Sequence, residues 1–403
     1  MPSTLLRQAT IVHGPVTQTP SDVLIVDGMI TEIAPSITAA DVETDVIDLE
    51  GYLLSPAAVE PHAHLDKAFL AEAIANPTGD LMGAITAMQA HRDLLSVDSI
   101  TERAERAARL MAANGFRFVR THADLSVEHG LRSIEALMAV KRRVADVIDI
   151  EIVALSGWPV TGTQGAAQRA LLVDAMAMGA DLVGGCPHLD EGGQIAAATE
   201  FFLETATDHG VGVDLHTDET LNPDVLGLAT LADMVSAGFE HPVTASHCVS
   251  LGMLDADRQR QIAGRVAEAR ISVIALPHTN LFLQGRGHAP MPRGLTAVAA
   301  LRDAGVNLAA GADNLQDPFN PLGRACPFET AGLMIMTSHL LPSDAWGTVT
   351  HNAAAATGAG RVEMAPGSPG DLVAVRAATV REAIAFGPND RMAWRRGHAV
   401  PSV

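Results

Sequence analysis

The feature that most limits the fold is a regular alternation of short apolar runs and helix-like stretches between residues 52 and 355. Short runs rich in Val, Ile, Leu and Ala are typical of buried parallel strands, whereas intervals such as 134–144 and 296–302 show helical periodicity. The predicted strands are 52–59, 115–122, 148–155, 181–186, 210–216, 242–247, 271–276 and 305–311. A closed parallel barrel needs eight strand-helix units over about 300 residues, whereas a doubly wound sheet usually has fewer. We therefore predict an α/β fold built on a TIM-like (β/α)8 barrel.

The two ends of the chain carry a different, purely β-type pattern. The early runs are separated by turn signals, among them Asp27-Gly28, a dipeptide that favours a hairpin. These runs are 9–12, 22–26, 29–33 and 45–49, and a second set at the end of the chain comprises 370–375, 380–385 and 397–400. Neither set has enough apolar area to be stable alone. We expect both ends to pair into a small β-sandwich domain, residues 1–54 and 362–403, beside a barrel domain of residues 55–361.

Composition excludes several classes of protein. The formal net charge is −20, from 27 Lys and Arg against 47 Asp and Glu, and such a chain repels phosphate backbones and anionic membranes. The three cysteines are widely spaced, which argues against a disulfide framework. The N-terminus lacks a charged region followed by an apolar one, and no apolar run approaches membrane-spanning length. We expect a cytoplasmic protein with a small-molecule partner, and neither nucleic acid nor membrane.

Polar side chains collect where the predicted strands end. His62 and His64 follow the first run, and alternation along a strand directs both imidazoles to one side, where they can bind one metal ion. The later runs are followed by His122, Trp158, His188, His216, His247, His278, Asp313 and Asn314. Chemistry in such barrels sits at the carboxyl ends of the strands, and chance would scatter the 16 histidines. The pattern predicts a metal site there.

The order and spacing of these residues resemble the amidohydrolase superfamily, and more narrowly its cytosine deaminase-like group. The segments that carry the closer resemblance are 59–66, 119–122, 213–219, 243–247, 283–286 and 317–323. The resemblance covers nearly the whole chain. It implies a hydrolase acting on C–N bonds other than peptide bonds, with a divalent ion, zinc or iron, held by His62, His64, His216 and Asp313. Binuclear relatives have a lysine at the end of strand 4, where this chain has Gly184-Gly185-Cys186, so we expect one ion.

The resemblance also implies catalytic roles for three residues. Asp313 takes a proton from the attacking water, His247 orients that water, and Glu219 protonates the heterocycle and then assists departure of the amine. Taken alone, Glu219 could instead be an acid at a helix N-terminus, where the macrodipole favours it.

The departures from the group concern the substrate. Typical cytosine deaminases have Phe-Pro-Gln after strand 3, and the glutamine reads the pyrimidine edge; here the sequence is Leu155-Ser156-Gly157. Trp158 could offer a stacking face instead, or simply pack in the core. His122 matches a family position, either as a substrate contact or as a buried histidine. Phe319 stands where the group has tryptophan, and Asn314 is more similar to the triazine N-alkylaminohydrolases.

The expected function is that of a metal-dependent aminohydrolase, a deaminase that hydrolyses an exocyclic C–N bond of a small nitrogen heterocycle. The alternatives within enzymes are an N-alkylaminohydrolase and a cyclic amidohydrolase that opens the ring. A silent barrel acting as a binding protein is the alternative outside enzymes. The resemblance makes a homo-oligomer an expected assembly.

Overall fold

A parallel eight-stranded sheet forms the centre of the computed structural model, which describes residues 3–13, 16–38 and 44–402. Its strands pair in sequence order, each with the next. They are β6 (Ala58–Ala63), β7 (Phe116–Leu125), β8 (Asp149–Ser156), β9 (Leu182–Gly185), β10 (Val213–Thr217), β11 (Val243–His247), β12 (Ser272–Ala275) and β13 (Leu308–Ala310). Every predicted strand after the first overlaps one of these, and the predicted α/β barrel is confirmed.

The barrel closes between its first and last strands, where a single bridge joins Ala63 and Asp313. The backbone N–H of Asp313 donates to the carbonyl of His62 at 2.9 Å, and the N–H of His64 donates to the carbonyl of Asp313 at 3.1 Å. The buried Glu60 carboxylate accepts from the N–H of His62 and of Ala312. A Cβ on Gly311 would lie 2.6 Å from Glu60 Oε1, so this contact requires glycine. The closure therefore places two candidate metal ligands, His62 and Asp313, side by side.

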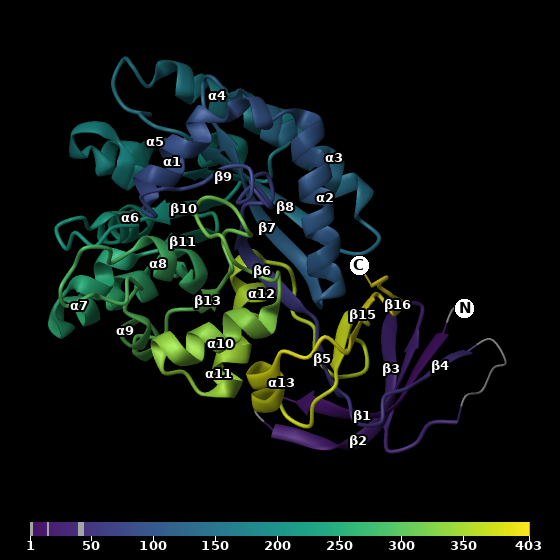
Figure 1. Ribbon diagram of the computed structural model, residues 1–403. Coiled ribbons are helices and arrows are strands. Elements are labelled where there is room, and N and C mark those ends of the chain that lie inside the picture. Colours follow the sequence, from purple (N-terminus) through teal and green to yellow (C-terminus); the bar gives the residue numbers. More distant parts are fainter. Residues whose placement is uncertain (1–2, 14–15, 39–43, 403) are drawn as a thin grey trace.

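Helices surround the barrel strands (Figure 1). They are α1 (Leu81–Ala90), α2 (Val97–Ala113), α3 (Arg132–Arg143), α4 (Ala166–Met178), α5 (Ile195–His209), α6 (Gly227–Ser236), α7 (Ala256–Glu268), α8 (Pro277–Leu283), α9 (Val298–Asp303), α10 (Pro327–Ser338), α11 (Pro342–Thr348) and α12 (His351–Thr357). In α2 the Ser96 side chain caps the first turn, and Ile100, Ala104 and Met111 share the buried face. None of the helices in the described ranges combines the length and apolar character needed to cross a bilayer.

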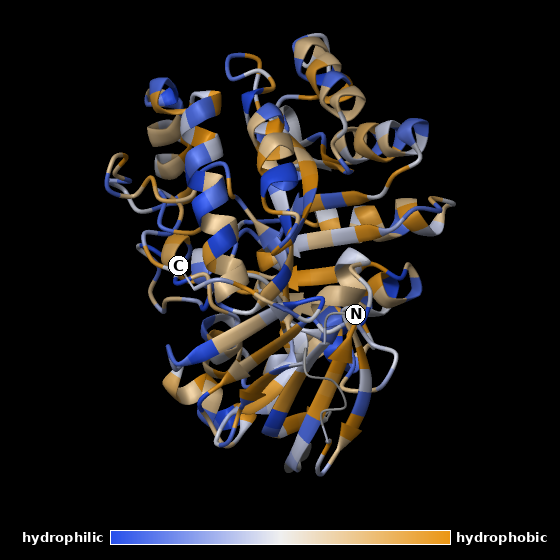
Figure 2. Cartoon of the chain, turned by 90° about the vertical axis from the view of Figure 1, so that its right-hand side faces the viewer, coloured by the Kyte–Doolittle hydropathy of each residue, from blue (hydrophilic) through white to orange (hydrophobic). Residues whose placement is uncertain are grey.

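Strands from both chain ends form a second, mixed sheet beside the barrel, as predicted. In Figure 1 the purple strands of the N-terminal region and the yellow strands of the C-terminal region lie together, and in Figure 2 these strands carry orange, hydrophobic segments interspersed with blue, hydrophilic ones. These strands are β1 (Ser3–His13), β2 (Val16–Val26), β3 (Met29–Ala34), β4 (Thr44–Asp48), β5 (Leu53–Pro56), β14 (Leu372–Val375), β15 (Arg391–Arg395) and β16 (His398–Ala399). The order is β16-β15-β14-β5-β1-β2-β3, with β4 paired to β1.

Two sequence-based predictions need correction. The run 52–59 is not one strand: β5 pairs with β14 in the small sheet, whereas β6 begins the barrel two residues later. The predicted strand 380–385 is wrong, because Val380–Phe386 forms helix α13. The Thr379 side chain accepts from the N–H of Glu382, and this N-cap favours a helix over a strand in a short run with little period-2 character. The proposed domain boundaries, 1–54, 55–361 and 362–403, remain predictions.

Candidate metal centre and active site

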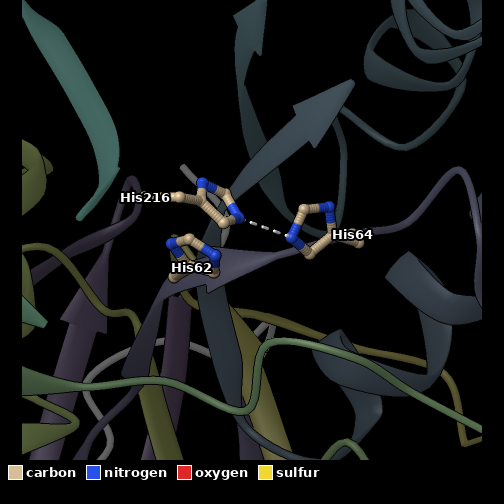
Figure 3. A group of neighbouring side chains, drawn as sticks. All are labelled: His62, His64 and His216. Carbon is tan, nitrogen blue, oxygen red and sulfur yellow. Dashed lines mark hydrogen bonds between the residues drawn. The ribbon is translucent and has the colours of Figure 1, made fainter. Parts of the chain in front are cut away.

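The four predicted metal ligands converge at the carboxyl ends of the barrel strands. His62 lies in β6 and His64 directly after it, His216 lies in β10, and Asp313 follows β13. The Nε2 atom of His64 lies 3.2 Å from Nε2 of His216 and 3.2 Å from Oδ1 of Asp313. Nε2 of His62 lies 3.5 Å from the same carboxylate oxygen. Figure 3 shows the three imidazoles turned toward one another. All four residues are buried.

The donor atoms of this group fit a divalent cation. Nε2 of His62 and both carboxylate oxygens of Asp313 are buried without a hydrogen-bond partner. A buried polar atom left unpaired costs about 1–3 kcal/mol, and a cation bound between these atoms would remove that cost. Imidazole nitrogens with one carboxylate are the ligand set that zinc and ferrous iron prefer. The residues therefore fit the metal that the sequence predicts.

The pKa shifts of His64, His216 and Asp313 favour the protonation states in which these residues can bind a metal ion. Burial lowers the pKa of His216 well below its usual value, and burial together with the Lys67 ammonium lowers the pKa of His64. For Asp313, burial alone would raise the pKa, but the adjacent His62 and His64 side chains hold it well below the usual range. Neutral imidazoles and an ionised carboxylate are the protonation states of metal ligands.

Glu219 and His247 lie next to the four candidate metal ligands, and both are buried. Nδ1 of His247 lies 3.6 Å from Oε1 of Glu219, and its Nε2 lies 3.9 Å from Oδ2 of Asp313. The Asn280 amide nitrogen lies 3.1 Å from Nδ1 of His247, an arrangement in which Nδ1 accepts and Nε2 carries the proton. Burial, followed by the Asp313 charge, raises the pKa of Glu219 well above its usual value, and burial lowers that of His247 to about 3. The raised pKa makes Glu219 a candidate proton donor.

Two of these residues have unusual backbone conformations. His247 has φ of 66° and Asp313 has φ of 63°, in the left-handed region that residues with a Cβ seldom adopt. Each costs on the order of 1–3 kcal/mol, and such strain clusters at active sites and ligand clamps. Here it turns the two side chains toward the cavity at the strand ends.

A cavity of about 520 Å³ opens above the metal ligands. His64, His216, Glu219, His247 and Asp313 line it together. A candidate water activator, a candidate acid and a candidate metal site therefore share one cavity, the arrangement expected for hydrolysis of a small molecule.

Residues 70–400 match the model of the amidohydrolase family. The chain belongs to this family. It is a hydrolase acting on C–N bonds. A pterin deaminase of Rhizobium rhizogenes is 33% identical over 388 residues, covering 94% of this chain and 87% of that protein.

Two solved structures are similar throughout. The 5-methylcytosine deaminase of Klebsiella pneumoniae, solved with 5-fluorocytosine, has a TM-score of 0.89 and 29% identity, covering 99% of this chain and 97% of that one. The N-isopropylammelide isopropylaminohydrolase of Burkholderia multivorans has a TM-score of 0.84 and 28% identity, covering 99% and 98%. The expected superfamily and its deaminase and triazine branches are thus confirmed.

Three of the four predicted substrate residues line the cavity of this amidohydrolase, namely Trp158, Asn314 and Phe319. The Asn314 side chain is already engaged, because its oxygen accepts from Thr279 and its amide donates to Asp317. His122 is buried and does not line the cavity; its ring packs against that of His62, with centroids 4.0 Å apart.

Sequence reasoning missed several parts of the amidohydrolase site. Helix α1 contributes Leu81, Ile85 and Met88 to the cavity wall, and nothing in its short amphipathic pattern indicates this position. Ser246 contacts His62 directly, and Asp214 contacts it through the Ser246 hydroxyl. Strand alternation could have indicated Asp214, which is two residues before His216, but not Ser246, which is adjacent to His247.

Proposed function

We propose that this chain is a metal-dependent aminohydrolase that releases ammonia from an exocyclic C–N bond of a small nitrogen heterocycle. The observation that carries the proposal is the pairing, in one cavity, of a metal-competent His and Asp set with a buried carboxyl group, Glu219, whose pKa burial raises. Deamination needs both, because water must be activated at one side of the carbon and the nitrogen protonated at the other.

The chain's own residues divide this work. His62, His64, His216 and Asp313 hold the ion, which supplies Lewis acidity that makes a water molecule acidic near neutral pH. Asp313 then accepts the proton of the attacking water, and the Nε2–H of His247 donates a hydrogen bond that orients it. Glu219 donates its proton to a ring nitrogen, recovers a first water proton by way of Asp313, and passes it to the amine as the C–N bond breaks. The second water proton leaves the new C–O group by the same route, which gives the carbonyl product, free ammonia and Glu219 in its starting protonated form. We propose one ion per chain; a content of two would contradict this.

A bicyclic 2-amino-4-oxopteridine is the first substrate to test. The relative with 33% identity is a pterin deaminase, and the cavity of about 520 Å³ is within the usual range for small-molecule sites and exceeds the needs of a single pyrimidine ring. Trp158 and Phe319 on the cavity wall offer aromatic faces for such a ring. Trp158, Phe319 and Asn314 are therefore proposed as substrate contacts, and His122 as support for His62.

A second candidate is removal of an alkylamine from a triazine-type ring. It is favoured by the similarity to the isopropylaminohydrolase and by Asn314 at the strand 8 end. Release of an alkylamine without ammonia, measured across a substrate panel, would identify this reaction. Ring opening, the remaining alternative, would instead give a carboxylate product.

The decisive experiment combines a substrate panel with the Glu219→Gln variant. Metal-loaded enzyme is assayed for ammonia release from pterins, cytosine, isocytosine, creatinine and aminotriazines. Glu219→Gln keeps its metal but loses about 10²- to 10⁴-fold in kcat, the usual contribution of general acid catalysis. Glu128→Gln, at the cavity rim with a largely exposed side chain, is the matched control and keeps its turnover. Near-normal kcat in Glu219→Gln would remove Glu219 from the mechanism.

A further inference from the structure

A chain of buried polar groups runs beneath the metal ligands through the interior of the barrel. Nδ1 of His62, in β6, lies 2.8 Å from the hydroxyl of Ser246, in β11. The Ser246 hydroxyl donates to Oδ1 of Asp214, in β10, at 3.0 Å. Arg120, in β7, donates to the other carboxylate oxygen of Asp214 at 2.9 Å. His62, Ser246 and Asp214 are fully buried and Arg120 nearly so, so water does not complete these bonds.

The proton positions in this chain follow from the chemistry of its members. An ionised carboxylate beside a guanidinium only accepts hydrogen bonds, so the single proton of the Ser246 hydroxyl is directed at Asp214. The lone pairs of Ser246 Oγ are then the groups facing His62, and Nδ1 of His62 must carry the ring proton. A neutral imidazole has only one N–H, so Nε2 presents a lone pair. That atom is buried, has no hydrogen-bond partner, and lies 3.5 Å from Asp313.

We propose that Ser246 and Asp214 are positioning residues that fix the tautomer and ring orientation of His62, and thereby set the affinity of the site for its metal. The inference rests on the metal site of the proposed function. Outer groups of this kind orient metal-binding histidines, and their loss typically lowers metal affinity about 10- to 100-fold. Here the carboxylate acts through a hydroxyl, because the contact between Asp214 and His62 is carried by Ser246 Oγ.

The test is metal binding by full-length variants of Ser246, without substrate. Metal-free protein is titrated with Zn²⁺ against a competing chelator, and the Co²⁺-loaded protein gives a visible spectrum that reports ligand geometry. Ser246→Ala raises the Zn²⁺ dissociation constant about 10- to 100-fold and alters the Co²⁺ spectrum. Ser246→Thr keeps the hydroxyl and restores both to near the values of the unmodified protein.

Ser250→Ala is the matched control. Ser250 is also buried, and its hydroxyl donates to the carbonyl of Val225 rather than to a candidate metal ligand. Its metal affinity stays unchanged, and thermal unfolding of the metal-free proteins separates loss of fold from loss of affinity. Unchanged Zn²⁺ affinity in a folded Ser246→Ala protein overturns the inference, as does equal weakening in Ser246→Ala and Ser246→Thr.

The outcome is independent of the identity of the heterocycle. If Zn²⁺ binds and responds to Ser246 as expected but no amine is released from any ring, the proposed function fails while the inference stands. If the unmodified protein binds neither Zn²⁺ nor Fe²⁺, the metal site fails, and the inference falls with it.

Discussion

Two sides of the same cavity bury ionisable groups in opposite ways. On one side, the histidine site consists of His62, His64, His216, His247 and Asp313, whose donor atoms face one another without a cation from the chain. On the other side, Asp66, Lys67 and Asp124 form a charged wall that contains its own cation. Nζ of Lys67 lies 2.5 Å from Oδ1 of Asp124 and 3.7 Å from Oδ1 of Asp66.

The difference shows where a metal is needed. His64, Asp66 and Asp124 are close enough together to form a second metal-competent group, but the Lys67 ammonium already neutralises those carboxylates. Burial alone would lower the pKa of Lys67, yet the Asp124 and Asp66 charges raise it above its usual value. A buried carboxylate needs a positive partner, and the chain supplies one to the charged wall only. Residues of the histidine site should therefore matter mainly for metal and turnover, and those of the charged wall mainly for stability.

Replacing Asp313 by Asn should give the largest effect. The substitution removes a metal ligand and the proton acceptor together, so metal content falls and turnover drops about 10⁴-fold, the upper end for general base catalysis. Metal analysis and ammonia release on one preparation measure both, with Asp257→Asn on the exposed surface of α7 as control. Retention of a tenth of the turnover would show that Asp313 is not part of the site.

Replacing Lys67 by Met should mainly destabilise the fold. It leaves the buried Asp66 without its cation, a change that typically costs about 3–5 kcal/mol. We expect about 3 kcal/mol, because the Asp124 side chain is 41% exposed and water partly replaces its partner. Denaturant unfolding of the metal-free protein measures this against Lys141→Met. Lys141 pairs with Asp181 at 2.7 Å, but both are about one-third exposed, so this control loses about 1 kcal/mol or less. Equal losses in the two variants would contradict the stabilising role of the charged wall.

Acidification should affect the two sides differently. Burial lowers the pKa values of His64, His122, His216 and His247, so the unfolded chain binds protons below about pH 6.5 that the folded protein does not. These four histidines therefore make stability fall as pH drops below about 6.5, by up to about 1.4 kcal/mol per histidine per pH unit. The raised pKa values of Glu60 and Glu219 contribute in the opposite direction, because the folded protein binds protons there that the unfolded chain does not. The charged wall contributes little in this window. Burial would raise the pKa of Asp66, but Lys67 lowers it overall, so its contribution is lost only below about pH 4.

Unfolding of the metal-free protein at pH 7.5, 6.5 and 5.5 measures this dependence. His122→Asn removes one buried imidazole that does not line the cavity, and its stability should fall less steeply by about 1.4 kcal/mol per pH unit at most. A His122→Asn protein whose stability has the same pH dependence as that of the unmodified protein would contradict the assignment of a neutral imidazole to His122.

The barrel was predictable because its strands are buried on both faces and so stand out as apolar runs between helical stretches. Two segments of the chain differ from the predicted strands. Residues 380–385 were too short for periodicity to separate strand from helix, and the Thr379 cap decided for the helix. The run 52–59 was predicted to be one buried strand. It is buried, but it is divided between two sheets, because its first half pairs with β14 and its second half with β7.

The sequence by itself was enough to predict the candidate ligand set, since His62, His64, His216 and Asp313 each lie at a strand end and parallel strands bring those ends to one face. Only the tertiary structure decided which groups support them. Ser246 is 184 residues from His62 in the chain, and Lys67 is 57 residues from Asp124. Contacts of this kind depend on the register of neighbouring strands and on barrel closure, where a shift of one residue turns every side chain to the other face. Local pattern contains no information about that register, so the chain of hydrogen bonds beneath the metal site and the charged wall appear only in the folded molecule.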